Sequence, residues 1–238
     1  LHYALILPGD LERRLAVSRD LPALAREAGS VRLEVIAWVW LIFDLLQVPD
    51  LPEADRAIAR LDELNLRLRQ PFWEWLSLGV RACRSLMEGQ PDEVGRLVFK
   101  ALQVGQRTST PNALLFFGTQ LFHLRAEQRR ADELLPVMEQ IVRERPGLPV
   151  FTIGIPLIHA LAGREAEARV TFDAVAANGF RDVSEDFHQL PMLCSSATVA
   201  AFLGDAQRAR ILRGMLREHA GRIVMAGVVT YWAGSVDH

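Results

Sequence analysis

Amphipathic stretches alternate with short polar breaks along this chain. Between residues 94 and 105, apolar side chains recur every three or four residues and charged or polar ones take the positions between them, which is the period of an amphipathic helix. A second apolar stripe, over residues 72–86, precedes the break at Gly89, so we expect the two helices to lie antiparallel across a short turn. Strand patterns are nearly absent apart from "RIVMAGVVTYW", residues 222–232, whose end is ambiguous.

The breaks recur at a nearly constant interval. One residue marks each of them: Gly9, Pro49, Gly89, Arg129, Gly163 and Gly204. The intervals are 40, 40, 40, 34 and 41 residues, and an apolar residue stands five positions after every break except the first, where Arg14 stands. Helix pairs repeated at this period predict an all-α fold: an α-α superhelix, or tetratricopeptide-like (TPR-like) solenoid, with about six repeats of 34–41 residues.

Both ends of the sequence fall inside this repeat pattern. Residues after Gly221 would begin the first helix of a seventh repeat, and residues 1–8 would be the remainder of an earlier first helix. The sequence therefore predicts that residues 1–238 form a single solenoid that is a fragment of a longer multidomain protein. Ends of this kind would expose apolar side chains, among them Val228, Val229, Tyr231 and Trp232.

Composition and charge narrow the classes of partner. The chain has 238 residues, half of them apolar, which is enough to bury a sizeable core. Its formal charge of -2 and its lack of a basic block argue against direct binding of nucleic acid. The most apolar run, "VIAWVWLIFDLL", is interrupted by Asp44 and is too short to cross a membrane. Cys83 and Cys194 lie in separate apolar surroundings, which favours two buried thiols in a cytoplasmic protein over a disulfide.

The patterns of common catalytic and cofactor sites are missing from the sequence. The only lysine, Lys100, lies outside any phosphate-binding loop, and the histidines and cysteines show no metal-ligand spacing. The cluster "DVSEDFH", residues 182–188, could pair a carboxylate with an imidazole, but a polar loop with Asp182 or Ser184 as a helix N-cap is the favoured interpretation. We therefore expect a protein that is not an enzyme and has no catalytic residues, metal or cofactor.

Two groups of residues are candidates for binding a ligand or partner. One group shares a helix face at spacings i, i+4, i+7 and i+11: Asn112, Phe116, Thr119 and His123. An aromatic ring among three hydrogen-bonding groups could hold a peptide or a small ligand, and a partly polar seam between repeats is the alternative.

Two W-x-W pairs supply the second group, with Trp38 and Trp73 as the candidate binding residues. Each is followed two positions later by another tryptophan. Side chains two apart on a helix point in different directions, so we expect one tryptophan of each pair to reach the surface. Packing between repeats is the alternative to a binding platform.

Several segments carry a family resemblance. Among them are "LRQPFWEW", "GQPDEVGRLVFKALQVGQRTSTPNAL", "QLFHLRAEQRRADELLPVMEQIV", "LAGREAEARVTFDAVAANGF" and "HAGRIVMAGVVTYWAGSVD". Over residues 10–238 the chain resembles the TPR-like helical region of bacterial signal-transduction ATPases and LuxR-type transcriptional regulators, some of which carry a nucleotide-cyclase domain. The resemblance implies a regulatory module that docks a protein partner or the parent's own domains. Sensing of a small-molecule inducer in the concave groove is the alternative, and an enzyme of unrecognised type is a third.

Three irregularities interrupt the pattern. Such regions commonly place glycine in the turn where this chain has Arg129, and Pro22 sits inside a predicted helix. In the fifth repeat, three prolines and Gly154 lie within residues 146–156, which predicts that the first helix there is shortened or kinked.

Overall fold

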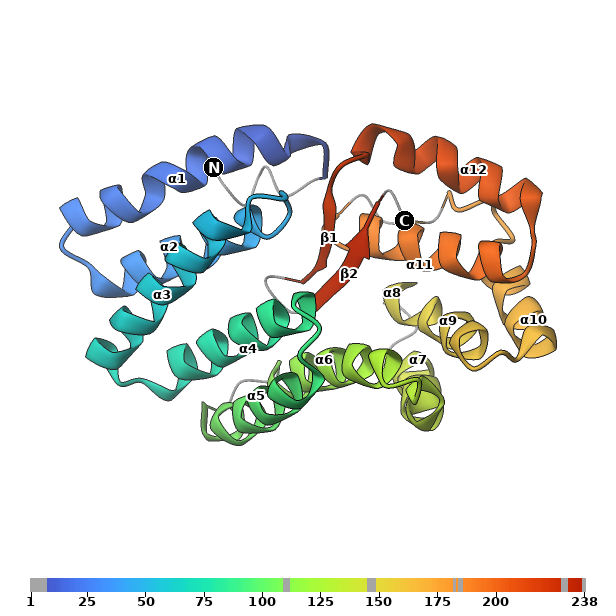
Figure 1. Cartoon of the computed structure of the whole chain (residues 1–238), viewed down its shortest axis with the longest axis horizontal. Coiled ribbons are helices and arrows are strands. Elements are labelled where there is room, and N and C mark those ends of the chain that lie inside the picture. The colour runs from blue at the N-terminus through green and yellow to red at the C-terminus, as the bar shows by residue number, and fades with distance from the viewer. Residues whose placement is uncertain are drawn as a thin grey trace. The chain divides into compact units, whose positions relative to one another are not determined.

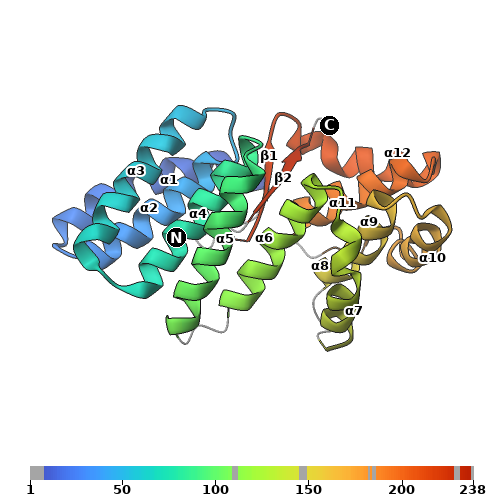
Figure 2. The ribbon, with the colours of Figure 1, turned by 60° about the horizontal axis from the view of Figure 1, so that its bottom comes forward.

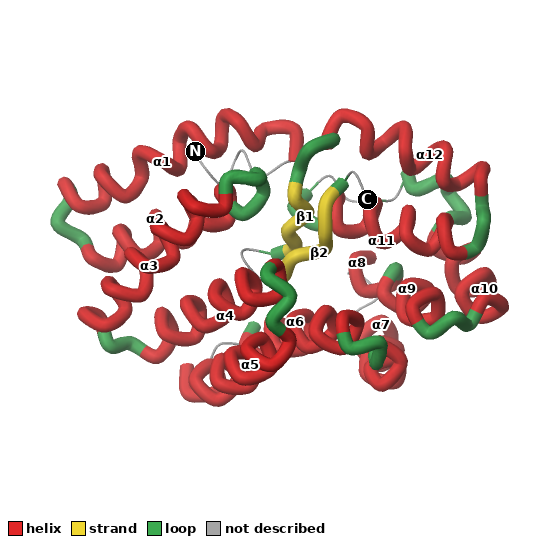
Figure 3. The backbone as a smooth tube through the Cα atoms, viewed as in Figure 1, coloured by secondary structure: helices red, strands yellow, loops and turns green. Residues whose placement is uncertain are grey.

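The fold is almost entirely helical in a computed structural model that describes residues 8–108, 112–144, 149–181, 183, 186–227 and 231–236 (Figures 1 and 3). This confirms the predicted all-α class. The longer helices are α1 (Leu11–Glu27), α2 (Val31–Leu45), α3 (Leu51–Leu68), α4 (Pro71–Met87), α5 (Pro91–Gly105), α6 (Ala113–Glu127), α7 (Leu135–Glu144), α10 (Glu165–Val175), α11 (Gln189–Phe202) and α12 (Ala206–Leu216). Short helices α8 (Pro149–Thr152) and α9 (Gly154–Leu161) lie between α7 and α10.

The chain divides into two compact units. The first unit contains the residues up to Leu124 together with Gly221–Val236, and the second unit contains Arg125–Ala220. The first unit therefore contains α1 to α5, most of α6 and the C-terminal segment, and the second contains α7 to α12. That residues 1–238 form one continuous array stays a prediction.

Four of the sequence breaks share one left-handed turn. Gly89, Arg129, Gly163 and Gly204 have φ values of 67°, 57°, 72° and 63°. At each of them the residue's N–H donates to the carbonyl three positions back, and the next N–H donates to the carbonyl five positions before it, which is the Schellman pattern that ends a helix. The same turn geometry therefore ends α4, α6, α9 and α11, with glycine at three of the four positions and Arg129 at the other.

The position five residues after each break faces the protein interior. Ala54, Val94 and Ala168 are buried there, while Leu134 and Ala209 are half-buried. Arg14, which holds this position after the first break, is also buried, with 1% of its surface exposed. Burial at this position is therefore independent of whether the side chain is apolar.

Two apolar clusters form the core of the first unit. The first core cluster joins α2, α3 and the C-terminal half of α4, with Ile42, Leu45 and Leu61 among its fully buried side chains. The second core cluster joins α4, α5 and α6 around Leu97 and Val98. Because α4 contributes to both, two of its faces are covered by protein.

The segment after Gly221 forms a β-hairpin, so the prediction of a seventh-repeat helix is wrong. Strands β1 (Ile223–Ala226) and β2 (Tyr231–Ser235) pair antiparallel with an irregular register. Gly221 and Gly227 have positive φ at the two ends of β1, which leaves a run too short for a stable helix. The predicted exposure of Val228 and Val229, and of the side chains of Tyr231 and Trp232, lies outside the described residues.

The hairpin belongs to the first unit because its apolar residues are buried there. Val224 and Met225 are buried, and Met225 is part of the first core cluster. The Ile223 N–H donates to the Gln47 carbonyl at 3.1 Å, and β2 contacts α4 (Figures 1 and 2). These contacts join residues far apart in the sequence. A repeat pattern, in which each helix packs on its neighbours, predicts no such long-range contact.

Proline has different effects at its two irregular positions. In the fifth repeat the helix is divided into α8 and α9 at Ile153, which agrees with the predicted interruption, although Pro146 lies outside the described residues. In contrast, α1 continues through Pro22, whose side chain is buried. A proline lacks the N–H that would bond to the carbonyl four residues earlier, so α1 loses one hydrogen bond there without ending.

Candidate binding site

The six predicted site residues all lie in the first unit but do not form one group. Trp38 is in α2, Trp73 is in α4, and Asn112 directly precedes α6, which carries the remaining three. The structure brings Trp73 and Phe116 into one group through two further aromatic rings, those of Phe72 and Trp75.

These four residues, Phe72, Trp73, Trp75 and Phe116, make a continuous set of ring contacts that we call the aromatic cluster. The centroid of the Phe72 ring lies 4.8 Å from the centroid of the Trp73 ring and 5.6 Å from that of Trp75, and the Trp75 and Phe116 ring centroids are 4.9 Å apart. The ring pairs are tilted or edge-on, as is favourable for aromatic contacts. Phe72 is 39% exposed and Trp73 and Phe116 are half-buried, so the cluster presents apolar surface at the N-terminal end of α4.

Trp75 anchors the cluster because it is 96% buried in the second core cluster. Its place depends on Gly105 at the end of α5. A Cβ at that position would lie 2.8 Å from Trp75 Cδ1 and 2.8 Å from the Ala113 Cβ, closer than side-chain atoms approach. The missing side chain of Gly105 therefore makes room for the indole.

Neither pair has a fully exposed tryptophan, although three of the four rings keep part of their surface exposed. Trp75 is buried and Trp38, Trp40 and Trp73 are half-buried. In α4 the two rings do point in different directions, but Trp73 packs on the first core cluster and Trp75 belongs to the second. Both directions are covered because α4 has neighbouring helices on two sides.

Phe116 lies on a seam where α6 approaches α4. One turn further along α6, the buried Gln120 donates from Nε2 to the Gly79 carbonyl at 2.8 Å. A Cβ on Gly79 would lie 3.9 Å from the Phe116 ring and 3.8 Å from Gln120 Nε2. This corresponds to the partly polar seam that was the alternative interpretation of the α6 face.

The other members of that face have separate environments. Asn112 is exposed, and its carbonyl accepts the N–H of Phe116 at 2.9 Å. Thr119 donates its hydroxyl to the Leu115 carbonyl at 2.8 Å, within its own helix. His123 is half-buried against Phe122, and desolvation lowers the pKa of its imidazole to about 3, so the ring is neutral at physiological pH.

Trp38 is a packing residue of α2. It lies against the first core cluster, and its buried Nε1 has no hydrogen-bond partner among the described residues. An indole donor with no acceptor is costly to bury, so the ring is held there by its apolar contacts.

Sequence reasoning did not select two members of the cluster, Phe72 and Trp75, as binding residues. The periodicity placed Phe72 on an apolar helix stripe, whose members are normally buried. The available signal was its position directly after Pro71, the first residue of α4, where the helix has not yet reached its neighbours. An apolar side chain at a helix start is covered less completely than one in the middle.

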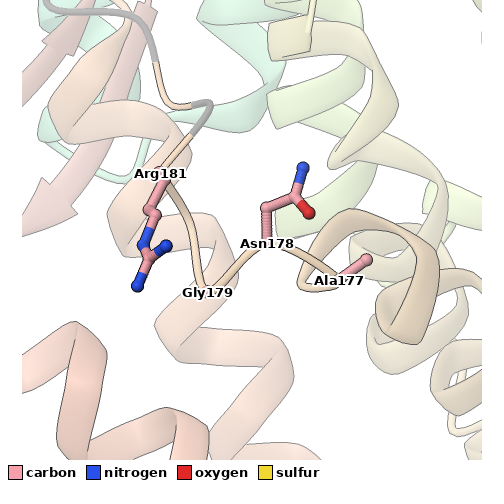
Figure 4. A pocket seen from close by; sticks show the side chains of 4 residues that line it. All are labelled: Ala177, Asn178, Gly179 and Arg181. Carbon is pink, nitrogen blue, oxygen red and sulfur yellow. The ribbon is translucent and has the colours of Figure 1, made fainter.

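The second unit has a depression of about 460 Å³ at the loop after α10 (Figure 4). It is lined by Ala177, Asn178, Gly179 and Arg181, and the side chains of Asn178 and Arg181 diverge. All four residues are exposed, while Phe180 between them turns inward against Phe172. The depression is therefore open surface with one cationic side chain, and it offers no acid–base pair.

The described part of the chain shows neither a metal site nor a reactive cysteine. There, no three histidine, cysteine or acidic side chains gather as a metal site would require. None of the described helices has the length and apolar character needed to cross a bilayer. Cys83 and Cys194 are free thiols, and burial raises their pKa values to about 12 and about 11. The proposed N-caps Asp182 and Ser184 lie outside the described residues, and His188 is the residue that precedes α11.

No family model, curated protein or solved structure matches the chain.

Proposed function

We propose that the chain is a non-catalytic protein-interaction module of the TPR-like solenoid kind, part of a bacterial signalling ATPase or transcriptional regulator. In this proposal its antiparallel helix pairs form about six repeats, and the module docks a protein partner or the parent's own domains. The recurrent left-handed turn at Gly89, Arg129, Gly163 and Gly204 supports the repeat, since one turn geometry recurs at the predicted breaks.

The aromatic cluster is the proposed contact surface for the partner. The observation that carries this proposal is the exposure of Phe72, whose ring contacts both the half-buried Trp73 and the buried Trp75. Rings held by a buried anchor lose little conformational freedom on binding, and aromatic residues of this kind dominate the energy of many protein interfaces. An apolar segment of the partner is the complementary surface.

The test begins with a photo-reactive phenylalanine analogue at position 72 of the parent protein, introduced in cells. The cross-linked protein is identified and purified, and its affinity for the chain is measured by isothermal titration calorimetry. Phe72→Ala should weaken binding by about 1–3 kcal/mol, the range for an interface anchor. Because Phe72 is partly exposed, the variant should keep the folded stability of the parent chain.

Phe99→Ala is the matched control, since Phe99 is 49% exposed in the same unit but lies outside the aromatic cluster. Its affinity for the cross-linked partner should equal that of the unmodified chain. Equal losses for the two variants, or no loss for Phe72→Ala, would contradict the proposal. A small metabolite that raises the melting temperature of the chain but not of Phe72→Ala would favour inducer sensing instead.

A further inference from the structure

We infer a second docking surface, on α12, for an acidic helix of a protein partner. It consists of Arg210, Arg213 and Arg217, which we call the arginine ridge. The ridge lies in the second unit and does not depend on the aromatic cluster.

The three ridge arginines occupy one exposed strip of helix. Their spacing of i, i+3 and i+7 places them along the same side of α12 and its continuation, over about 10 Å at the usual helical rise. The buried Leu212 and Leu216 lie on a different side of the helix, where α12 packs against α11. All three arginines are exposed.

The charge of the ridge is only partly balanced by neighbouring acidic residues. Arg210, Arg213 and Arg217 take part in no ion pair within the described residues, whereas Arg208 on the same helix pairs with Asp173 and Asp205. Between Gln189 and Arg217 the sequence has no acid other than Asp205, and α11 has no charged residue at all. The neighbouring Glu218 is exposed, and its Oε1 lies 3.5 Å from Nε2 of the buried His219. With Glu218 counted against the three arginines, a local excess of about two positive charges stands on a chain whose formal charge is -2.

An acidic helix is the partner that this surface suits best. Carboxylates at the same helical spacing could meet all three guanidinium groups, with two parallel hydrogen bonds each. Ile211, 41% exposed and adjacent to the ridge, supplies apolar contact that a phosphate backbone would not use. Proteins that bind DNA commonly neutralise six to ten phosphates from strongly basic domains, so three arginines are too few.

The probes are a short helical peptide with glutamates along one face and leucines beside them, and the same peptide with glutamine in place of glutamate. Binding to the full chain is measured by fluorescence anisotropy at low and at near-physiological salt. We expect the glutamate peptide to bind, the glutamine peptide to bind more weakly, and salt to reduce the difference. Failure of the glutamate peptide to bind at low salt would overturn the inference.

The decisive variant is the triple substitution Arg210→Gln, Arg213→Gln and Arg217→Gln. It should weaken binding of the glutamate peptide by about tenfold or more, since each exposed pair contributes about 0.5 kcal/mol. The control is Arg32→Gln, Arg56→Gln and Arg67→Gln, which removes the same charge from exposed positions of the first unit. Equal losses in the two triple variants would overturn the ridge as a site.

A short double-stranded DNA is the third probe. Tighter binding of this DNA than of the glutamate peptide, lost in the ridge variant, would assign the surface to nucleic acid and overturn the acidic-helix inference. Thermal unfolding of both triple variants should match that of the unmodified chain, because none of the six arginines is buried. Ile211→Ser should lower the affinity of the chain for the glutamate peptide without changing how that affinity depends on salt.

Discussion

Arg14 and Asp44 form an ion pair in the interior of the first unit. Arg14 Nε lies 2.5 Å from Asp44 Oδ1, and the two side chains are 1% and 0% exposed. Arg14 also lies over the Phe43 ring, with its guanidinium carbon 5.2 Å from the ring centroid. The pair joins α1 to α2. Each residue is an exception to the hydrophobic pattern, and each is the partner that makes burial of the other tolerable.

Removing one partner of this pair should destabilise the first unit strongly. Asp44→Ala leaves a buried guanidinium without its carboxylate, and breaking such a pair costs about 3–5 kcal/mol. The measurement is the free energy of unfolding in urea. Asp44→Leu combined with Arg14→Met should recover most of the loss, because neither charge is then buried. As a control, Arg19→Ala breaks the more exposed Arg19–Glu53 pair and should cost at most about 1 kcal/mol.

Arg129→Gly should stabilise the chain. Arg129 is exposed and has a left-handed backbone, with φ of 57°, at a turn where three equivalent positions have glycine. Relieving that conformation should add about 1 kcal/mol to the free energy of unfolding. Arg129→Ala keeps the Cβ that causes the strain, so it should give no such gain. A similar increase in both variants would show that the arginine side chain, and not the backbone, is responsible.

Gly105→Ala and Gly118→Ala should have opposite effects. The new methyl group at Gly105 would overlap Trp75 and the Cβ of Ala113, and overpacking of this kind costs about 1–3 kcal/mol. At Gly118, inside α6, the added Cβ would meet no described heavy atom within 4 Å beyond the backbone of its own helix, so the higher helix propensity of alanine should stabilise by about 0.5–1 kcal/mol. Thermal unfolding with tryptophan fluorescence detects both changes, and Gly105→Ala should also alter the emission of the folded state. A stabilised Gly105→Ala would contradict the packing described for Trp75.

The stability of the first unit should fall in mild acid because of His123. Its pKa is about 3 in the folded chain and about 6.5 when unfolded, so between these values the unfolded state holds one proton more. The free energy of unfolding therefore decreases as the pH drops below about 6.5, and this contribution levels off below about pH 3. His123→Gln should make the free energy of unfolding depend less steeply on pH between about 3 and 6.5, and should leave its pH dependence above pH 7 unchanged. If the variant and the unmodified chain showed the same pH dependence of the free energy of unfolding, the imidazole would be protonated in the folded chain as it is in the unfolded one.

Half of the candidate binding site was predictable. Trp73 and Phe116 were singled out as aromatic residues on first helices, and both belong to the aromatic cluster. Phe72 and Trp75 were not, because their exposure and burial depend on where α5 and α6 meet α4. Asn112, Thr119 and His123 share a helix face in sequence, but Asn112 lies at the exposed start of α6 and Thr119 bonds within its own helix.

The sequence by itself determined the all-α class and the turns that end four of the helices, α4, α6, α9 and α11. These features depend on local properties, namely the 3.6-residue period and the residues that allow a left-handed turn, such as Gly89 and Gly163. The tertiary structure alone decided three features: the burial of Arg14 with Asp44, the hairpin after Gly221 and the exposure of Phe72. Each depends on contacts between residues far apart in the chain, and local periodicity contains no information about which distant side chain will cover a given face.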